Sequence, residues 1–490
     1  MRTNRTGSII WRLLPALWPI LAGAARFEDH TAAMGLTLPA KGGGACWVDY
    51  DRDGWVDLVA GGILWRNDEG KRFVEVTRIG SVVAADFDND GWVDFYSWSA
   101  RRLYRNDAGQ GLIEVELPAF PEGYASLGAA WGDFTGDGWV DLYVGGYENW
   151  NKGITHPDLL LVNRGGHSFE ITWRDDRSRA RGVTACDFNR DGRLDVYVSN
   201  YRLQPNRLWR NSGGGILEDV AAAHNAVATS EGFAGGHSIG AAWGDFDNDG
   251  DFDLFAGNFA HVDQRGDQPK SRFLRNRGPA HGYRFEDRGP CGIPYQESYA
   301  SPAAADYDND GWLDLYFTTV YAPASFGRMN YPVLFRNDSA LHFNDVNAAV
   351  GLAELPPTYQ AAWADVNNNG HLDLLTAGRL FLNPGTTNHW IKIRLEGDGR
   401  LVNRAAIGAQ ARIRIGDQII TRQVEAGTGQ GNQNDLNLHF GLGQAAEPVA
   451  LEILWPGGYR QTITGLTTDK QHVIHFERPT EGAAHPEDAP

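Results

Sequence analysis

The sequence predicts an all-β protein in which a seven-bladed β-propeller is followed by a small β-sandwich-like domain. Three observations predict this fold class: a short acidic loop that recurs seven times, an apolar strand ending in asparagine after each loop, and an N-terminal stretch that repeats the outer strand of the last blade. The composition agrees, because 60 glycines and 17 tryptophans are typical of short strands joined by tight turns.

The acidic loop is nine residues long. It has aspartate at positions 1 and 9, glycine at position 6, and aspartate or a neutral oxygen donor at positions 3 and 5. Its copies start 37 to 61 residues apart, which is the spacing of propeller blades. The copies are loop 1 (49–57), loop 2 (86–94), loop 3 (133–141), loop 4 (187–195), loop 5 (245–253), loop 6 (306–314) and loop 7 (365–373).

The strand after each loop ends in an asparagine: Asn67, Asn106, Asn163, Asn211, Asn276, Asn337 and Asn383. An outer strand follows six of these asparagines, and the seventh outer strand lies at the other end of the chain. There FEDHTAAMGL (27–36) matches FNDVNAAVGL (343–352). Pairing this N-terminal strand with the last blade would close the ring and leave no open sheet edge.

The spacing of the loop acids indicates calcium binding. Calcium takes six to eight oxygen ligands, and carboxylates at alternating loop positions converge to supply them, with a backbone carbonyl at position 7. No glutamate stands at position 12 and an apolar strand follows, so the loop joins two strands. The predicted ligands are Asp49, Asp51, Asp53, Trp55, Asp57, Asp86, Asp88, Asp90, Trp92, Asp94, Asp133, Thr135, Asp137, Trp139, Asp141, Asp187, Asn189, Asp191, Arg193, Asp195, Asp245, Asp247, Asp249, Asp251, Asp253, Asp306, Asp308, Asp310, Trp312, Asp314, Asp365, Asn367, Asn369, His371 and Asp373.

The loops differ in their number of carboxylates. Loops 1, 2, 5 and 6 have aspartate at all four acidic positions, loops 3 and 4 have a neutral oxygen at position 3, and loop 7 has asparagine at positions 3 and 5. We therefore expect several calcium ions, up to seven, with weaker sites in loops 3 and 4 and the least support for a site in loop 7. Asp365→Ala should destabilise far less than Asp88→Ala or Asp308→Ala. The alternative is that the aspartates only shape turns, which does not explain one spacing repeated seven times.

The C-terminal part has a different pattern. Residues 388–478 alternate apolar and polar residues over short runs, which predicts a small β domain, whereas 479–490 form an acidic tail that we expect to be disordered. The propeller is then assigned to residues 26–387.

Together these motifs resemble a known family. The loops and their apolar flanks resemble the FG-GAP or VCBS repeats of integrin α-subunit propellers. The stretches NHWIKIRLEG (388–397), NRAAIGAQARI (403–413), LHFGLG (438–443) and LEILWPGGYRQ (451–461) resemble an ASPIC/UnbV domain. The combination is similar to the cartilage acidic protein family and its bacterial relatives, and it implies calcium binding and interaction, sometimes with a label of enediyne biosynthesis. Gly431 and Asn432 stand where the pattern has an aromatic residue and a serine.

Charge and the N-terminus indicate the compartment. A net charge of −18 without a basic stripe argues against nucleic-acid binding. Residues 1–25 combine early arginines, an apolar run and small residues before a cleavage point, which predicts a signal peptide and a secreted or periplasmic protein. An uncleaved anchor is the weaker alternative, because the apolar run is too short to span a bilayer. The three cysteines do not make a disulfide framework, and Cys46 and Cys186 are predicted to be buried thiols.

A ligand is expected on the face opposite the calcium loops. The loop that leaves the second strand lies on that face, and it is long only in blades three to six. The alternative is that these are ordinary packed loops with aromatic residues at the rim. The candidate ligand-binding residues are Tyr147, Trp150, His237, His261, Tyr299, Tyr321, Arg328, Tyr331 and Tyr359.

Three functions fit these patterns. The first is a recognition or adhesion module for a glycan, a protein or a small molecule. The second is a calcium-dependent enzyme, a lyase or a biosynthetic cyclase, built at the propeller mouth around His237, His261, Tyr299 and Arg328. The third is a scaffold whose C-terminal domain docks a partner. The sequence contains no H-E-x-x-H helix or P-loop, which favours the first function.

Overall fold

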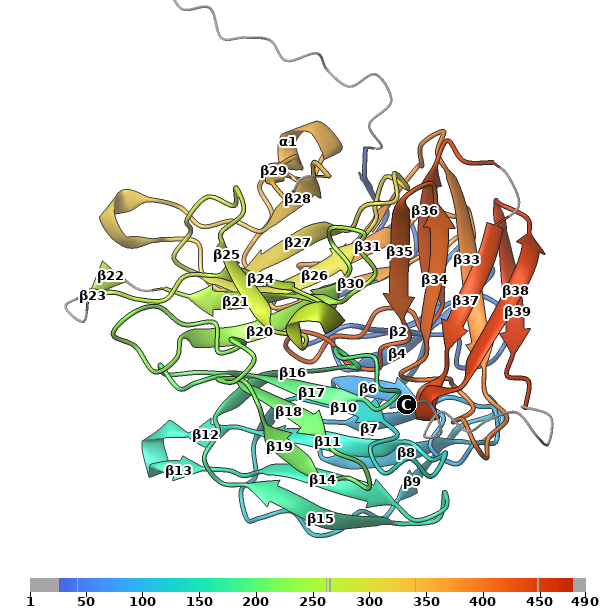
Figure 1. Ribbon diagram of the computed structural model, residues 1–490, viewed down its shortest axis with the longest axis horizontal. Coiled ribbons are helices and arrows are strands. Elements are labelled where there is room, and N and C mark those ends of the chain that lie inside the picture. Colours follow the sequence, from blue (N-terminus) through green and yellow to red (C-terminus); the bar gives the residue numbers. More distant parts are fainter. Residues whose placement is uncertain are drawn as a thin grey trace, which may run out of the picture.

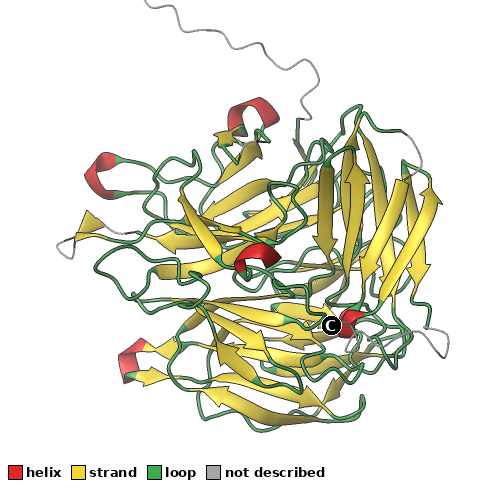
Figure 2. Ribbon diagram, viewed as in Figure 1, coloured by secondary structure: helices red, strands yellow, loops and turns green. Residues whose placement is uncertain are grey.

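The computed structural model describes residues 26–41, 43–260, 262–263, 266–339, 341–446 and 449–478. The predicted signal peptide and acidic tail lie outside these residues. Strands make up almost all of the regular structure (Figure 2), and the helices are single short turns: η1 (Trp150–Lys152), η2 (Pro279–His281), η3 (Ser325–Gly327), α1 (Asn347–Val350) and η4 (Pro456–Gly458). Within the described residues, no helix has the length and apolar character needed to cross a membrane.

Seven four-stranded antiparallel sheets occupy the described part of 26–383, which confirms the all-β prediction. Sheet 1 contains β2 (Cys46–Val48), β3 (Asp57–Ala60), β4 (Ile63–Asn67) and β5 (Phe73–Arg78); sheet 2 contains β6 (Val82–Ala85), β7 (Asp94–Ser97), β8 (Arg102–Asn106) and β9 (Leu112–Val115); sheet 3 contains β10 (Ser126–Gly132), β11 (Asp141–Gly146), β14 (Asp158–Asn163) and β15 (Phe169–Asp175). Sheet 4 contains β16 (Ala180–Cys186), β17 (Asp195–Asn200), β18 (Arg207–Asn211) and β19 (Leu217–Asp219); sheet 5 contains β20 (His237–Gly244), β21 (Asp253–Phe259), β24 (Arg272–Asn276) and β25 (Phe285–Gly289). Sheet 6 contains β26 (Tyr299–Ala305), β27 (Asp314–Thr319), β28 (Val333–Asn337) and β29 (Phe343–Asp345); sheet 7 contains β30 (Ala361–Ala364), β31 (Asp373–Thr376), β32 (Arg379–Leu382) and β1 (Glu28–Asp29).

Burial explains the residue types in each strand. The first and second strands of a sheet are buried on both faces, as in β20 and β21, because neighbouring sheets pack against both sides. They therefore read as continuous runs of alanine, valine, leucine and aromatic residues. The fourth strand alternates, as in β15, where buried Phe169 is followed by exposed and half-buried positions. An alternating strand is expected where one face meets solvent.

The first strands of successive sheets contact one another from β2 to β30, and β30 contacts β2. The N-terminal strand β1 pairs with β32 of sheet 7, with Glu28 opposite Leu382. The predicted exchange of the N-terminal strand into the last sheet is therefore present. All three cysteines are free, and Cys46 and Cys186 are buried as predicted.

The C-terminal module (388–478) contains two sheets. One sheet has the order β35-β34-β37-β38 and the other β36-β33-β39, in which β33 and β39 are parallel. Figure 1 shows the module on one side of the seven sheets, opposite the small hairpins β12–β13 and β22–β23. Its strands are β33 (His389–Glu396), β34 (Gln410–Ile415), β35 (Gln418–Gln423), β36 (Leu438–Gly443), β37 (Val449–Leu454), β38 (Arg460–Leu466) and β39 (Lys470–His475), and the hairpins are β12 (Glu148–Asn149), β13 (Ile154–Thr155), β22 (Val262–Asp263) and β23 (Gly266–Asp267).

The module touches all seven acidic loops. For example, the Thr421 N–H donates to Asp245 of loop 5 at 3.0 Å, and the Gly443 N–H donates to the Asn309 carbonyl of loop 6 at 2.9 Å. The remaining contacts are Arg394 with Asp49, Arg404 with Asn89, Arg400 with Gly138, Gly457 with Gly192, and Lys392 with Asp365. The module therefore packs against the acidic loops.

A glycine-rich stretch of the module, the central segment (425–435), runs between the first strands of the seven sheets. It contacts every one of them, through Trp47, Ala84, Trp131, Arg181, Gly240, Ser301 and Ala361. Gly431 lies against Gly44. A Cβ added at Gly44 would stand 1.5 Å from the Gly431 carbonyl oxygen. Asn432 Oδ1 accepts the N–H groups of Ala45 and Ala361, and so it joins sheet 1 to sheet 7.

Candidate metal centres and the opposite face

Each acidic loop is shaped by its own carboxylates. In loop 2, Asp86 accepts the N–H groups of Asp90 and Gly91, and Asp90 accepts the N–H of Trp92 at 2.8 Å. Gly91 has a φ of +92°, which favours glycine at position 6. These turns place the side chains of positions 1, 3 and 5 on the inside of the loop.

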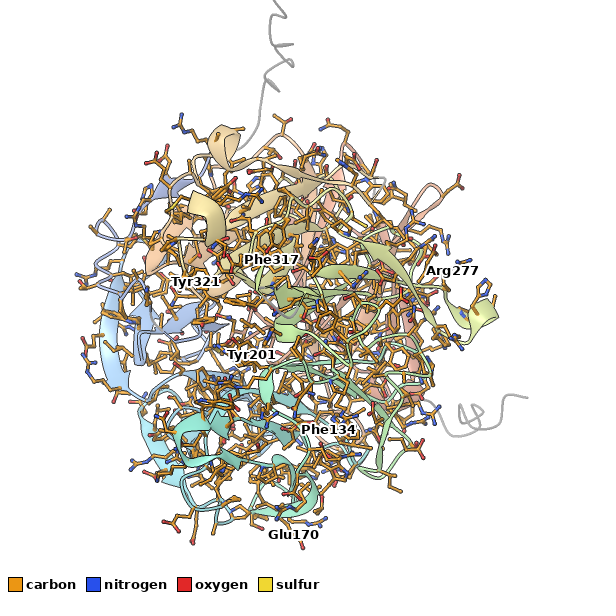
Figure 3. All side chains as sticks on the ribbon, turned by 90° about the vertical axis from the view of Figure 1, so that its left-hand side faces the viewer. Phe134, Glu170, Tyr201, Arg277, Phe317 and Tyr321 are labelled. Carbon is orange, nitrogen blue, oxygen red and sulfur yellow. The ribbon has the colours of Figure 1, made fainter. Side chains whose placement is uncertain are left out.

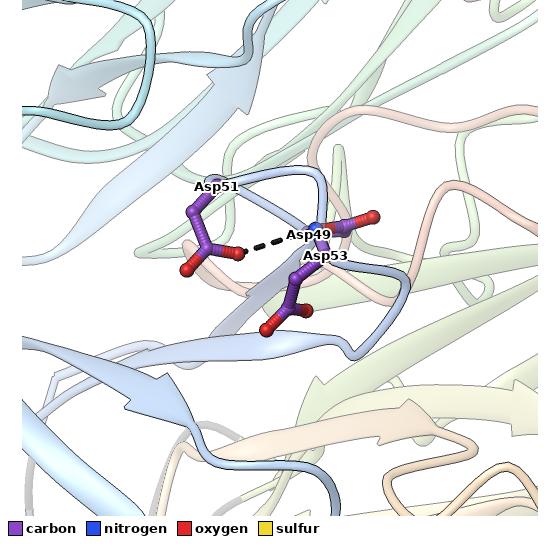
Figure 4. A group of neighbouring side chains, drawn as sticks. All are labelled: Asp49, Asp51 and Asp53. Carbon is purple, nitrogen blue, oxygen red and sulfur yellow. Dashed lines mark hydrogen bonds between the residues drawn. The ribbon is translucent and has the colours of Figure 1, made fainter.

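Four loops bring three carboxylates within 4.8 Å of one another, so that each could hold a metal ion. They are the four loops with a full set of aspartates. The triads are Asp49, Asp51 and Asp53 (Figure 4); Asp86, Asp88 and Asp90; Asp245, Asp247 and Asp249; and Asp306, Asp308 and Asp314. The count of carboxylates in the sequence therefore picked out the loops in which the side chains converge.

The triads fit a cation in their electrostatics as well. Asp49 Oδ1 and Asp308 Oδ1 are buried and have no hydrogen-bond partner among the described residues. Burial, with repulsion from neighbouring carboxylates, raises the pKa of Asp86 to about 7 and that of Asp245 to about 8. In loops 5 and 6, Arg275 and Arg336 pair with the carboxylates at positions 3 and 5 and offset part of this repulsion. Each of these triads still carries more carboxylates than its one arginine neutralises, and buried unpaired charge is unfavourable. A bound cation would therefore remove a cost that the triads otherwise carry.

Loops 3, 4 and 7 lack such a triad among the described residues. In loop 3, Thr135 stands at position 3 and its hydroxyl is buried. In loop 4, the Asn189 amide donates to Asp191 at 3.0 Å. The ligand sets of these three loops remain predictions.

The aspartate at position 9 accepts a hydrogen bond from the backbone N–H of the strand-end asparagine in the same sheet. Asp57 accepts the N–H of Asn67 at 2.7 Å and the N–H of Tyr50 at 2.9 Å, and burial raises its pKa to about 9. The Asn67 amide donates to the Val56 carbonyl of its own loop and to the Val366 carbonyl of loop 7. The Asp–Asn bond recurs in all seven sheets. The recurring asparagines are evident in the sequence, but their role is not: each side-chain amide donates to a carbonyl in the loop of the preceding sheet.

The comparisons with known proteins match both parts of the chain. Residues 86–144 and 187–256 match an FG-GAP-like repeat, and residues 399–484 match ASPIC and UnbV. The chain carries FG-GAP-like repeats and an ASPIC and UnbV segment. It is a distant homologue of cartilage acidic protein 1: the Homo sapiens protein is 25% identical over 394 residues (72% of this chain, 54% of the relative), and the Mus musculus protein is 25% identical over 318 residues (61% and 45%). The chain thus spans about half the length of these relatives.

Two solved structures are also similar to the chain. A crystal structure of BBS1N in complex with ARL6DN has a TM-score of 0.41 and 11% identity, covering 73% of this chain and 96% of that one. The exotype rhamnogalacturonan lyase YesX has a TM-score of 0.29 and 12% identity, covering 74% and 78%.

The face of the seven sheets away from the module carries an arginine surrounded by tyrosines. The Arg181 guanidinium lies 5.3 Å from the ring of Tyr147, 5.1 Å from Tyr201 and 5.4 Å from Tyr359. It also donates to Gln430 of the central segment at 3.0 Å. Figure 3 looks onto this face and labels Tyr201 near its middle. We call these four residues the Arg181 cluster. Tyr147 and Tyr359 are among the ligand-binding residues predicted from the sequence, whereas Arg181 is not, because it lies inside strand β16.

The other ligand candidates are spread over the same face. Trp150 is exposed and stacks on Arg202 at 3.8 Å, and Tyr331 and Arg328 are also exposed. Tyr321 packs edge-on against Phe259.

Two of the candidates lie deeper. Tyr299 is buried and stacks on Phe317, and His237 is buried beside Tyr201. The structure therefore places Tyr147 and Tyr359 around the Arg181 guanidinium and places Tyr299 in the core. His261 lies outside the described residues.

Proposed function

We propose that this protein is an exported, calcium-stabilised seven-bladed β-propeller that recognises a ligand on the face opposite its calcium loops. The observation that carries the proposal is the set of four aspartate triads in equivalent loops of a repeated sheet. Ring closure is supported by the contact of β30 with β2 and by the bond from Asn67 to loop 7. Export is proposed from the signal-like residues 1–25.

Calcium is the cation that suits these donors. The triads offer only hard carboxylate oxygens, and the loops add backbone carbonyls, which is the ligand set that calcium prefers. Bound calcium would supply charge neutralisation at the turns between the first and second strands. The chain's own residues do the rest: position 6 glycines make the turn, and position 9 aspartates fix the strand end.

Calcium content tests this assignment. We expect at least four calcium ions per chain by elemental analysis after dialysis, because four loops form triads. Asp86→Asn should lower the count by one, because it removes a carboxylate from a triad. Asp176→Asn, a change in an exposed aspartate outside the loops, is the matched control and should leave the count unchanged. A calcium-free wild-type protein would refute the proposal.

The stability of the protein should depend on pH in opposite ways with and without calcium. In the metal-free protein, the raised pKa values of about 7 for Asp86 and about 8 for Asp245 mean that the folded state holds protons that the unfolded chain releases near pH 4. Stability should therefore fall as the pH rises from about 4 to 8. With saturating calcium it should rise over the same window, since protons and calcium compete for the same oxygens. Thermal melts at several pH values, with calcium and with EDTA, measure both slopes.

The Arg181 cluster is the proposed centre of ligand recognition. A guanidinium between phenol rings offers hydrogen-bond donors to an acidic group and aromatic faces to a ring or chain attached to it. We therefore expect binding to carboxylated or sulfated glycans in preference to their neutral counterparts. Arg181→Met should lower that affinity about tenfold or more, while Arg164→Met, an exposed arginine paired with Glu170, should not change it. A glycan array followed by calorimetry provides the measurement, and equal binding by both variants would remove the cluster from the proposal.

A further inference from the structure

Loop 7 has a donor set unlike that of the four triads. In every acidic loop, the first side-chain oxygen at position 5 accepts the N–H of position 7, as Asp53 Oδ1 does from Trp55. The other oxygen of that carboxylate is a possible cation ligand, and in loops 5 and 6 it also pairs with Arg275 and Arg336, respectively. In loop 7 the residue is Asn369: its Oδ1 accepts from His371 at 2.9 Å, and its Nδ2 donates to the Asn383 carbonyl at 3.1 Å. An N–H₂ group in this position cannot ligate a metal ion.

A positive charge already lies on loop 7. Lys392 Nζ is 2.9 Å from Asp365 Oδ2 and 3.0 Å from Asn368 Oδ1. The side chains of Lys392 and Asp365 are 4% and 0% exposed, so this is a buried ion pair. Lys392 comes from β33 of the C-terminal module. Two residues along the same strand, and hence on the same side of it, Arg394 approaches Asp49 of loop 1 at 3.7 Å, beyond hydrogen-bond distance.

We propose that loop 7 binds no divalent cation and that the Lys392 ammonium neutralises it instead, which makes loop 7 a calcium-independent anchor for the C-terminal module. A basic side chain alone does not distinguish loop 7, because Arg275 and Arg336 pair with positions 3 and 5 of loops 5 and 6. Loop 7 differs in that its ammonium is buried on Asp365 at position 1, while positions 3 and 5 are asparagines. A cation there would meet the repulsion of the ammonium without two further carboxylates to offset it. The proposal rests on the calcium assignment of the other loops for its contrast, but the ion pair itself does not need calcium.

Calcium counting separates loop 7 from the triads. Asp365→Asn is expected to leave the number of bound calcium ions unchanged, whereas Asp86→Asn lowers it by one. Loss of one ion in Asp365→Asn would overturn the proposal. If Asp86→Asn loses no ion either and the wild-type protein is calcium-free, the calcium assignment fails, and the anchor is judged by the next measurement.

Amine labelling tests the anchor without reference to calcium content, and it needs no variant. Wild-type protein is treated with sulfo-NHS-acetate, with calcium and then with EDTA, and acetylation is followed by mass spectrometry. Lys470 on the neighbouring strand β39 is exposed and serves as the internal control. We expect Lys392 to be acetylated at least about tenfold more slowly than Lys470 in both conditions, because it stays buried in the pair with Asp365. Equal rates for the two lysines in EDTA would refute a calcium-independent anchor.

Discussion

Removal of calcium is expected to lower the melting temperature of this protein by more than about 10 °C. Each site that binds calcium only in the folded state adds about 2.7 kcal/mol when free calcium is a hundredfold above its dissociation constant. The four triads together would then add about 11 kcal/mol, which is comparable to the whole stability of an ordinary domain. The measurement is a pair of calorimetric scans, one in saturating calcium and one in EDTA.

Two further scans make this result specific. Magnesium at the same concentration should restore little of the stability, because magnesium demands octahedral geometry and gives up its water reluctantly. Asp306→Asn should reduce the difference between the calcium and EDTA scans by roughly a quarter, because it disables one of the four triads. Identical melts in calcium and EDTA would show that the triads are turn-forming residues only.

Substitution of Gly44 is expected to expel the central segment from between the seven sheets. A Cβ at this position would stand 1.5 Å from the Gly431 oxygen, and that neighbour is backbone, which cannot rotate away. Gly44→Val should cost at least about 3 kcal/mol, at the upper end of ordinary overpacking. It should also break the nearby bonds that Asn432 and Gln433 make to sheets 1, 2 and 7. Hydrogen exchange of residues 425–435 by mass spectrometry, together with the melt, is the direct measurement.

Gly111→Val is the matched control, because a Cβ there meets no atom within 4 Å and the residue is exposed. It should melt and exchange like the wild-type protein. If Gly44→Val keeps slow exchange across 425–435, the close approach of Gly44 and Gly431 is not what fixes the segment.

The destabilisation expected for the aspartate variants of the loops differs between the sequence and the structure. From the missing carboxylates of loop 7, the sequence predicts that Asp365→Ala destabilises less than Asp88→Ala or Asp308→Ala. The buried ion pair of Asp365 with Lys392 leads us to expect a large effect instead. Removing one partner of a buried ion pair typically costs 3–5 kcal/mol. Asp365→Ala should therefore destabilise the protein strongly in EDTA as well as in calcium.

Much of the fold and the four triads among the seven loops could be predicted because their signals are local. The triads depend on carboxylates two residues apart in one turn, and the strands depend on apolar runs of four to eight residues. The partners of the strand-end asparagines could not be predicted in this way. Asn67 bonds to Val366, and no periodic pattern links residues so far apart in the chain.

The sequence by itself determined the repeated strand–loop unit, the return of the N-terminal strand to the last sheet, and the four loops in which acids converge. Each follows from spacing within one repeat or from similarity between repeats. The tertiary structure alone decided that Lys392 neutralises loop 7, that Arg181 lies among three tyrosines, and that Gly431 and Asn432 serve close packing between sheets. The physical reason is that these features come from packing two parts of the chain face to face. Burial, charge pairing and close backbone approach then depend on which residues meet across that interface, and the spacing of residues along the chain does not record it.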